Sequence, residues 1–140
     1  MSQHFELKEF LRSSTALEKK IENLPTWEVI EHLNELAEFL EGLREAWGGP
    51  ITVTSGFRNS DLNKAVGGVN RSAHTAGYAA DLVPGRGDMQ GFKKRVVAWI
   101  KDKKFDQCIL EKNSSGSEWV HIGLYGPGGK QRCECFDLKV

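Results

Sequence analysis

The sequence predicts an α+β fold in a single domain of residues 1–140, with N-terminal helices packed on a small, mostly antiparallel sheet. Two observations lead to this prediction. Apolar residues recur at helical spacing in the first half of the chain and again between residues 88 and 100. Short apolar or β-branched segments, separated by turn residues, fill most of the last third. The chain is 39% hydrophobic and 27% charged, which is typical of an ordinary globular protein.

The clearest helix is expected to begin after Thr26, because threonine is a good N-cap residue. Its apolar positions recur as far as Trp47, and Gly48-Gly49-Pro50 ends the pattern. A shorter helix is expected at Leu7–Leu11. Asp88 is expected to cap a further helix. The apolar stripe of that helix contains Phe92, Val96, Val97, Trp99 and Ile100.

Strands are expected where β-branched and apolar residues follow one another between turn residues. They are predicted at Ile51–Thr54, Tyr78–Val83, Phe105–Glu111, Trp119–Tyr125 and Arg132–Leu138. Turn residues separate the last three, so an antiparallel meander is expected there. Residues 55–75 are expected to be mostly loop, with a short helical turn at 61–65.

Charge and hydropathy argue against several classes of partner. Nineteen Lys and Arg balance nineteen Asp and Glu, so no net field attracts nucleic acid or an acidic membrane. No apolar run approaches the ~20 residues that span a bilayer, and residues 1–8 lack a signal-peptide pattern. We therefore expect cytoplasmic synthesis, a monomer, and neither nucleic acid nor membrane as partner. The three cysteines contain no C-x-x-C pair and are expected to be reduced thiols, with Cys108 in a core strand.

One segment contains two residue types that bind Zn²⁺ well, in Ser72-Ala73-His74-Thr75-Ala76-Gly77-Tyr78-Ala79-Ala80-Asp81. Six residues separate His74 from Asp81, enough to place one on a loop and the other on the strand that the loop enters. Asp81 lies within an apolar strand, where a buried carboxylate needs a partner. A metal ion or Arg58 would serve. The alternative is an exposed His74 and an ordinary acid at a strand end.

His121 lies in a second apolar segment, Glu118-Trp119-Val120-His121-Ile122-Gly123. It is either a neutral core imidazole or a third ligand, which leaves the fourth position of a catalytic zinc open for water. Two carboxylates are candidates for the base that accepts the proton of that water. Glu118 points to the opposite face of a regular strand unless the chain bulges near Ser117. Glu111 lies roughly opposite His121, on the same face, if the hairpin turns about residues 115–117.

An arginine follows the first expected strand, in Ser55-Gly56-Phe57-Arg58-Asn59-Ser60. A guanidinium at a strand end is well placed to bind an anion or a developing oxyanion. The alternative is a surface Arg58 paired with Asp61 or a glutamate.

Together these motifs resemble the zinc D-Ala-D-Ala carboxypeptidase family, which has the hedgehog/DD-peptidase-like fold, and most of all its small phage and prophage branch. The likeness extends from about Phe5 to about Tyr125. It rests on three motifs in the family's order, Ser55-Gly56-Phe57-Arg58, Ser72-x-His74-x-x-Gly77-x-Ala79-x-Asp81 and Trp119-x-His121.

The resemblance implies one Zn²⁺ per chain, held by His74, Asp81 and His121. It also implies that Arg58 stabilises the carbonyl oxygen as it becomes tetrahedral, and that Ser72 lies at the substrate site. Members with a Glu-x-x-His pattern place the base at Glu118, which we favour at this point. Relatives in the small branch that keep an acid on the preceding strand place it at Glu111.

The implied function is a zinc metallopeptidase that hydrolyses peptidoglycan stem or cross-link peptides next to D-amino acids, as a carboxypeptidase or endopeptidase. A phage or prophage endolysin that reaches the cell wall after release agrees with the lack of a signal peptide. One alternative is a D,D-dipeptidase acting on cytoplasmic dipeptides. The other is a zinc-binding module of the same fold that binds the cell wall or a protein without hydrolysis. The presence of Arg58, Ser72 and a candidate base argues against that module.

Overall fold

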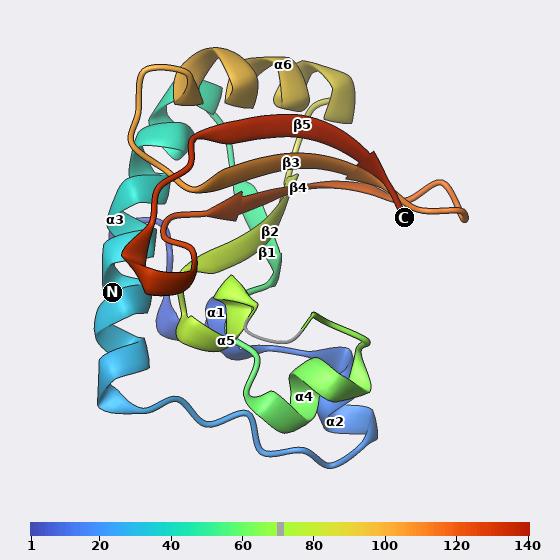
Figure 1. The fold of residues 1–140 in the computed structure, drawn as a ribbon. Helices are drawn as coiled ribbons and strands as arrows, with labels where there is room; N and C mark the ends of the chain where they lie inside the picture. The colour runs from blue at the N-terminus through green and yellow to red at the C-terminus, as the bar shows by residue number, and fades with distance from the viewer. Residues whose placement is uncertain (70–71) are drawn as a thin grey trace.

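The computed structural model describes residues 1–69 and 72–140, and it confirms the predicted α+β class (Figure 1). In this part of the chain, five strands form one sheet in the order β1-β2-β4-β3-β5. Neighbouring strands are antiparallel except β3 and β5, which are parallel. The strands are β1 (Ile51–Ser55), β2 (Ala79–Pro84), β3 (Gln107–Lys112), β4 (Glu118–Gly123) and β5 (Glu134–Lys139).

The helices form two groups (Figure 1). The long helices α3 (Trp27–Trp47) and α6 (Met89–Ile100) pack against each other and enclose the core with one face of the sheet. The short helices gather near β1 and β2, away from α6. They are α1 (Leu7–Leu11), α2 (Ser14–Glu18), α4 (Ser60–Ala65) and α5 (Ala73–Ala76), and a 3₁₀ turn, η1 (Pro127–Gly129), follows β4. Among the described residues, none of these helices is long and apolar enough to cross a bilayer.

The predicted helix ends are confirmed by their capping contacts. The Thr26 side chain accepts a hydrogen bond from the Val29 N–H at 3.2 Å and starts α3. Gly48 ends α3 in the left-handed conformation, with φ 75°. Asp88 caps α6 by accepting from the Gly91 N–H at 2.6 Å. The helical turn expected at 61–65 is α4. Helices α2 and α5 were not predicted, because four or five residues are too few to show helical periodicity.

The core lies between the two long helices and the sheet. The middle of the apolar stripe of α3 is fully buried and lies in one core cluster with residues of α6. The buried residues are Leu33, Leu36, Ala37, Leu40 and Leu43 of α3 and Phe92, Val96 and Ile100 of α6. Val97 is 38% exposed, so the apolar stripe expected in this helix is only partly buried.

Strand register gives the sheet two different faces. Leu82, Val120 and Leu110 are register partners on the face that meets the helices. Side chains alternate between faces along a strand. The next set of partners, Asp81, His121 and Ile109, therefore points to the opposite face.

Strand β5 runs parallel to β3, so the predicted meander is wrong for the last strand. β4 ends beside the start of β3. The chain then crosses past this end of β3 and forms β5 on the other side of β3, parallel to it. The Cys133 N–H donates to the Phe105 carbonyl at 2.9 Å, and the Glu134 N–H donates to the Asp106 carbonyl at 3.0 Å. These bonds align β5 with the beginning of β3. The three cysteines are free, and Cys108 is buried in β3 as expected.

The crossing to β5 is fixed by a paired aspartate. Asp106 is 2% exposed, and its carboxylate accepts from the backbone N, Nε and Nη2 of Arg132 at 3.1, 2.8 and 2.8 Å. We expect Asp106→Asn to lower the free energy of unfolding by about 1–3 kcal/mol, because charge-assisted bonds are lost while Arg132 stays in place. Urea denaturation at neutral pH measures this difference.

The same pair predicts a pH dependence of stability. The hydrogen bonds and charge of Arg132 hold the pKa of Asp106 below its usual range. A carboxyl whose pKa is lowered by folding stabilises the protein above its unfolded pKa, and this stabilisation is lost as the pH falls through the folded pKa. The difference in the free energy of unfolding between wild type and Asp106→Asn should therefore become smaller as the pH falls from about 7 to about 3. An unchanged difference would contradict the role given to this pair.

Candidate metal centre

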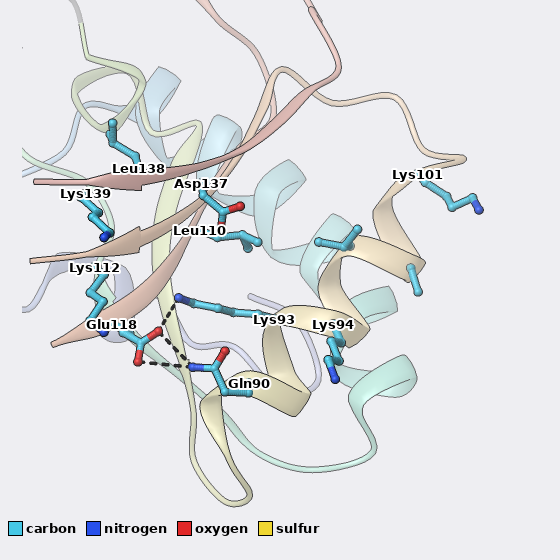
Figure 2. Close-up of a pocket in the computed structure, with 12 residues that line it drawn as sticks. Gln90, Lys93, Lys94, Lys101, Leu110, Lys112, Glu118, Asp137, Leu138 and Lys139 are labelled. Atoms are coloured by element: carbon cyan, nitrogen blue, oxygen red, sulfur yellow. Dashed lines mark hydrogen bonds and ion pairs between the residues drawn. The ribbon is translucent and has the colours of Figure 1, made fainter. Parts of the chain in front are cut away.

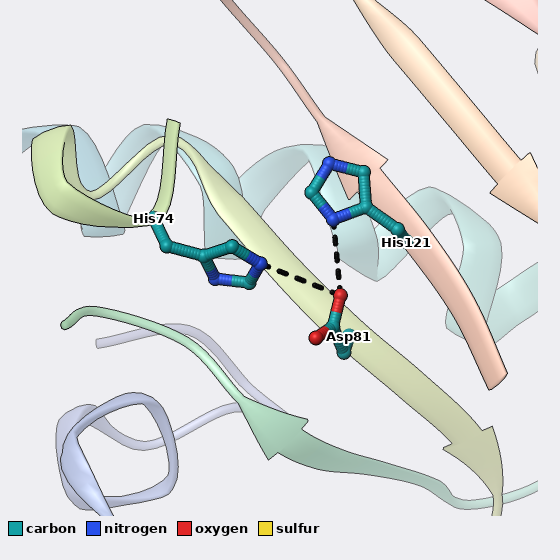
Figure 3. Close-up of side chains that lie close together, drawn as sticks. All are labelled: His74, Asp81 and His121. Carbon is teal, nitrogen blue, oxygen red and sulfur yellow. Dashed lines mark hydrogen bonds and ion pairs between the residues drawn. The ribbon is translucent and has the colours of Figure 1, made fainter. Parts of the chain in front are cut away.

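Three side chains from separate elements meet on the face of the sheet that points away from the core (Figure 3). His74 comes from α5, Asp81 from β2 and His121 from β4. His74 Nε2 lies 3.4 Å and His121 Nδ1 lies 3.0 Å from Asp81 Oδ1. One ligand atom of each residue lies within 4.8 Å of the others. The structure therefore brings together the three residues that the sequence motifs singled out as ligands.

Local structure fixes the orientation of His74. The Ser72 side chain caps α5 and accepts from the His74 N–H at 3.2 Å. Gly77 ends the helix with φ 80°. A Cβ at Gly77 would lie 3.0 Å from atoms of Val29, so glycine also allows the close approach of α3. The result is one helical turn that holds His74 against the end of β2.

The tautomer of His74 follows from its hydrogen bond. His74 Nδ1 lies 2.7 Å from the Gly56 carbonyl oxygen, which can only accept, so Nδ1 carries the proton. Nε2 then has a free lone pair, and it is the atom nearest to Asp81. A histidine held through its other ring nitrogen by a backbone carbonyl is typical of a metal ligand. This role of Gly56 could not be predicted from the sequence, because every residue type has a backbone carbonyl.

The charge states of His74 and Asp81 favour the binding of a cation. Burial lowers the pKa of His74 and outweighs the opposite effect of Asp81, so the imidazole is neutral. Burial by itself would raise the pKa of Asp81, but His74 and His121 hold that pKa well below its usual range. The carboxylate is therefore ionised. Two imidazole nitrogens and one carboxylate oxygen are a donor set of catalytic zinc sites.

The distances between the ligand atoms can also be compared with those around a zinc ion. Ligands at about 2.0–2.1 Å from a tetrahedral zinc lie about 3.3 Å from one another. The two distances to Asp81 Oδ1, 3.4 and 3.0 Å, are close to that value. These two separations, with all three ligand atoms within 4.8 Å of one another, are compatible with one zinc ion.

Glu111 lies on the same face of the sheet as these ligands. It is the register partner of Trp119, and its Oε2 accepts from Trp119 Nε1 at 3.1 Å. The hairpin turns between Asn113 and Ser117, so Glu111 lies diagonal to His121 rather than directly opposite. Burial raises the pKa of Glu111, and the charge of Asp81 adds to that effect. Glu111 is thus a partly buried carboxylate beside the ligand cluster.

Glu118 lies on the other face, so its expected position beside the ligands is wrong. Glu118 Oε1 accepts from Lys93 Nζ at 2.6 Å and from Gln90 Nε2 at 3.1 Å, both on α6. The pairing of β4 with β3 is regular through Glu118, without the bulge that would turn its side chain round. Strand alternation therefore places a residue three positions before His121 on the opposite face.

Arg58 lies next to the cluster because β1 ends there. Ser55, the last residue of β1, is the register partner of Asp81, and the chain then continues past the site. The Arg58 N–H donates to the His74 carbonyl at 3.1 Å. Burial lowers the pKa of Arg58, while the charges of Asp81 and Glu111 oppose that shift. In the described part of the chain Arg58 Nε is buried without a hydrogen-bond partner, and no ion pair joins Arg58 to Asp61.

Ser72 has a structural role as the N-cap of α5, in addition to its predicted position at the substrate site. Its oxygen caps α5, as described above, and only 9% of the residue is exposed. It also lines a hollow of about 490 Å³ together with Tyr78, Tyr125 and the turn at Gly126–Gly129. Contact of Ser72 with a substrate stays a prediction.

Comparison with known proteins places most of the chain in one family. Residues 3–123 match the family model described as Peptidase M15. A zinc D-Ala-D-Ala carboxypeptidase from Streptomyces albus G is 48% identical over 54 residues, which are 38% of this chain and 20% of that protein. The match thus spans about a fifth of the relative's length. The matched family region contains the three clustered residues, Arg58 and Glu111, whereas β5 lies beyond it.

Proposed function

Because the chain belongs to the peptidase M15 family, we propose that it is a zinc-dependent peptidase whose metal is held by His74, Asp81 and His121. The observation that carries this proposal is the cluster itself: a neutral imidazole and an ionised carboxylate meet a second imidazole within 4.8 Å. Structural zinc sites in proteins usually have four protein ligands. Three ligands with a carboxylate and a guanidinium beside them favour a catalytic site over a structural one.

Zinc bound at such a site polarises a carbonyl group and lowers the pKa of a water molecule to about 7. Glu111 then serves as general base. It accepts a proton at Oε1 or Oε2 and returns it to the leaving amine, and the Trp119 N–H fixes its orientation. The pKa of Glu111 is raised toward neutral pH, and a general base is most effective when its pKa lies near the working pH. The contact of Glu118 with Lys93, on the other face of the sheet, supports the choice of Glu111 over Glu118 for this role.

Arg58 is the second group that acts on the substrate. Its guanidinium has an unpartnered buried Nε in the described part of the chain, and it lies within the charge influence of both Asp81 and Glu111. Such a donor is suited to the oxygen of a carbonyl as negative charge develops on it. Arg58 therefore stabilises the tetrahedral state, while its backbone N–H holds α5 and with it His74.

The substrate class rests on the Streptomyces relative, whose name specifies a D-Ala-D-Ala carboxypeptidase. We propose peptidoglycan stem or cross-link peptides, cleaved next to a D-amino acid by a monomeric enzyme. A phage or prophage endolysin, made in the cytoplasm and released to the cell wall at lysis, is the cellular role that we propose. A non-hydrolytic zinc module of the same fold has no need for Glu111 and Arg58 beside the ligands, so we rank it second.

Two substrates test this function. The zinc-loaded wild type should release D-Ala from a stem peptide that ends in D-Ala-D-Ala, or open a purified cross-linked muropeptide, and chromatography distinguishes the two products. A metal chelator should stop the reaction, and added zinc should restore it. Failure of the zinc-loaded protein to cleave either substrate would favour the non-hydrolytic module.

Arg58→Gln is expected to lower kcat by about 10²–10³-fold, because an oxyanion donor acts mainly in the transition state. Zinc content should stay the same, since Arg58 is not a ligand. Arg58→Lys is the matched variant, which keeps the charge but lacks the planar fork of donors, and it should recover only part of the rate. Steady-state kinetics on zinc-loaded protein give the answer. A change in KM with kcat unchanged would assign Arg58 to substrate binding alone.

A further inference from the structure

A second concave surface lies on the opposite face of the sheet from the metal centre (Figure 2). It is a groove of about 900 Å³ between α6 and the ends of β3, β4 and β5. Gln90, Lys94 and Val97 of α6 line it, together with Lys101, the C-cap residue that directly follows the helix. These residues lie three or four positions apart and so share one side of the helix. The groove therefore runs along α6, and the mechanism proposed above uses none of it.

The floor of the groove is apolar. Leu110 of β3 lies beneath, with Val97 and Ala98 of α6 beside it. Val97 is a large apolar side chain that stays exposed on this helix, at 38%. An exposed apolar floor in a concave surface is typical of a binding groove.

The walls of the groove are basic, although the chain as a whole has no net charge. Five lysines line it against two acids. One acid, Glu118, is already paired with Lys93. The other four lysines lie on both walls, with Lys94 on α6, Lys101 at its C-cap, Lys112 on β3 and Lys139 on β5 (Figure 2). None of these four forms an ion pair within the described part of the chain.

One wall of the groove comes from a segment outside the family match. Asp137, Leu138 and Lys139 of β5 line the groove, whereas the family match ends at residue 123. The groove is therefore completed by a strand that the family model does not cover.

We propose that this groove binds an acidic amphipathic segment of a partner protein. Carboxylates of the segment pair with the lysines of the two walls, and its apolar side chains contact Leu110 and Val97. A flat bilayer cannot reach a floor that lies between a helix and strand ends. A phosphate polymer matches the lysines but has no apolar groups for the floor. The charge pattern and the floor together thus favour a peptide.

A synthetic peptide tests the proposal without knowledge of the natural partner. The peptide has Leu and Glu at helical spacing and a fluorescein label, and a second peptide has Lys in place of Glu. Fluorescence anisotropy with the folded full chain should show binding of the acidic peptide only, weakened by added salt. Lys94→Glu with Lys101→Glu should raise its Kd at least about tenfold, and Val97→Asp should also weaken it. These three positions are exposed, so the variants are expected to fold.

The matched control reverses two exposed lysines that do not line the groove, Lys19→Glu at the C-cap of α2 with Lys64→Glu in α4. Helices α2 and α4 lie at the opposite end of the molecule from α6 (Figure 1). This variant has the same net charge as the groove double variant and should bind like wild type. The proposal is overturned if wild type does not bind the acidic peptide, or if the control weakens binding as much as the groove variant. It is also overturned if polyphosphate or anionic vesicles bind more tightly than the acidic peptide and Val97→Asp does not change the Kd of that peptide.

Discussion

Replacing His74 with Ala is expected to remove the bound zinc and reduce peptide cleavage to background. His74 is 3% exposed, and its ring is held between the Gly56 carbonyl and Asp81. Without it only two ligands are left, and zinc affinity should fall by more than the 10–100-fold that loss of an outer-shell partner costs. Metal analysis after dialysis measures the zinc, and chromatography measures cleavage.

Two further variants make this result specific. His74→Gln keeps most of the buried volume, so it separates loss of the ligand from loss of packing. His4→Ala removes an exposed histidine that contacts Glu41, far from the cluster, and should keep zinc and activity. A folded His74→Ala protein that still contains one zinc per chain would show that the metal lies elsewhere.

The second large effect is expected for the general base. Glu111→Gln should lower kcat by about 10²–10⁴-fold, because proton transfer by a positioned carboxylate contributes about that much. Zinc content should not change, since Glu111 is not among the clustered ligand atoms. The glutamine oxygen can still accept from Trp119 Nε1, so the local structure is preserved. Steady-state kinetics on zinc-loaded protein provide the measurement.

Glu118→Gln is the matched control for this experiment, because it changes the other candidate in the same chemical way. Glu118 is bonded to Lys93 and Gln90 on the core side of the sheet, so its loss should change kcat by less than about twofold. If Glu118→Gln abolishes cleavage while Glu111→Gln does not, β4 must rearrange when substrate binds, and the assignment of Glu111 is wrong.

The elements with strong local signals were predicted correctly. Helix α3 has twenty-one residues with a continuous apolar stripe, and its ends are marked by Thr26 and Gly48. The residues of the metal cluster were also singled out in advance, because His74 and Asp81 lie close in the sequence and His121 follows in an apolar strand. Only a few residue types bind zinc, so a metal site is easier to predict from the sequence than a groove, which many residue types can line.

The parts that were missed depend on contacts between distant residues. The face on which Glu111 lies is decided by the register of β3 with β4, because a shift by one residue would turn it to the other face. Whether Glu118 faces the ligands is decided within β4, where the regular pairing leaves no bulge that would turn its side chain round. The direction of β5 depends on the pairing of Arg132 with Asp106, which are 26 residues apart. One wall of the groove along α6 comes from β5 and therefore depends on that direction. None of these contacts leaves a periodic pattern in the sequence.

Zinc titration of the metal-free wild type tests the central claim most directly, with calorimetry for binding and the stem-peptide assay run in parallel. The account predicts one zinc per chain, with cleavage restored in proportion to the zinc bound. A folded wild-type protein that takes up no zinc, or that cleaves equally well after the metal is removed, would contradict it.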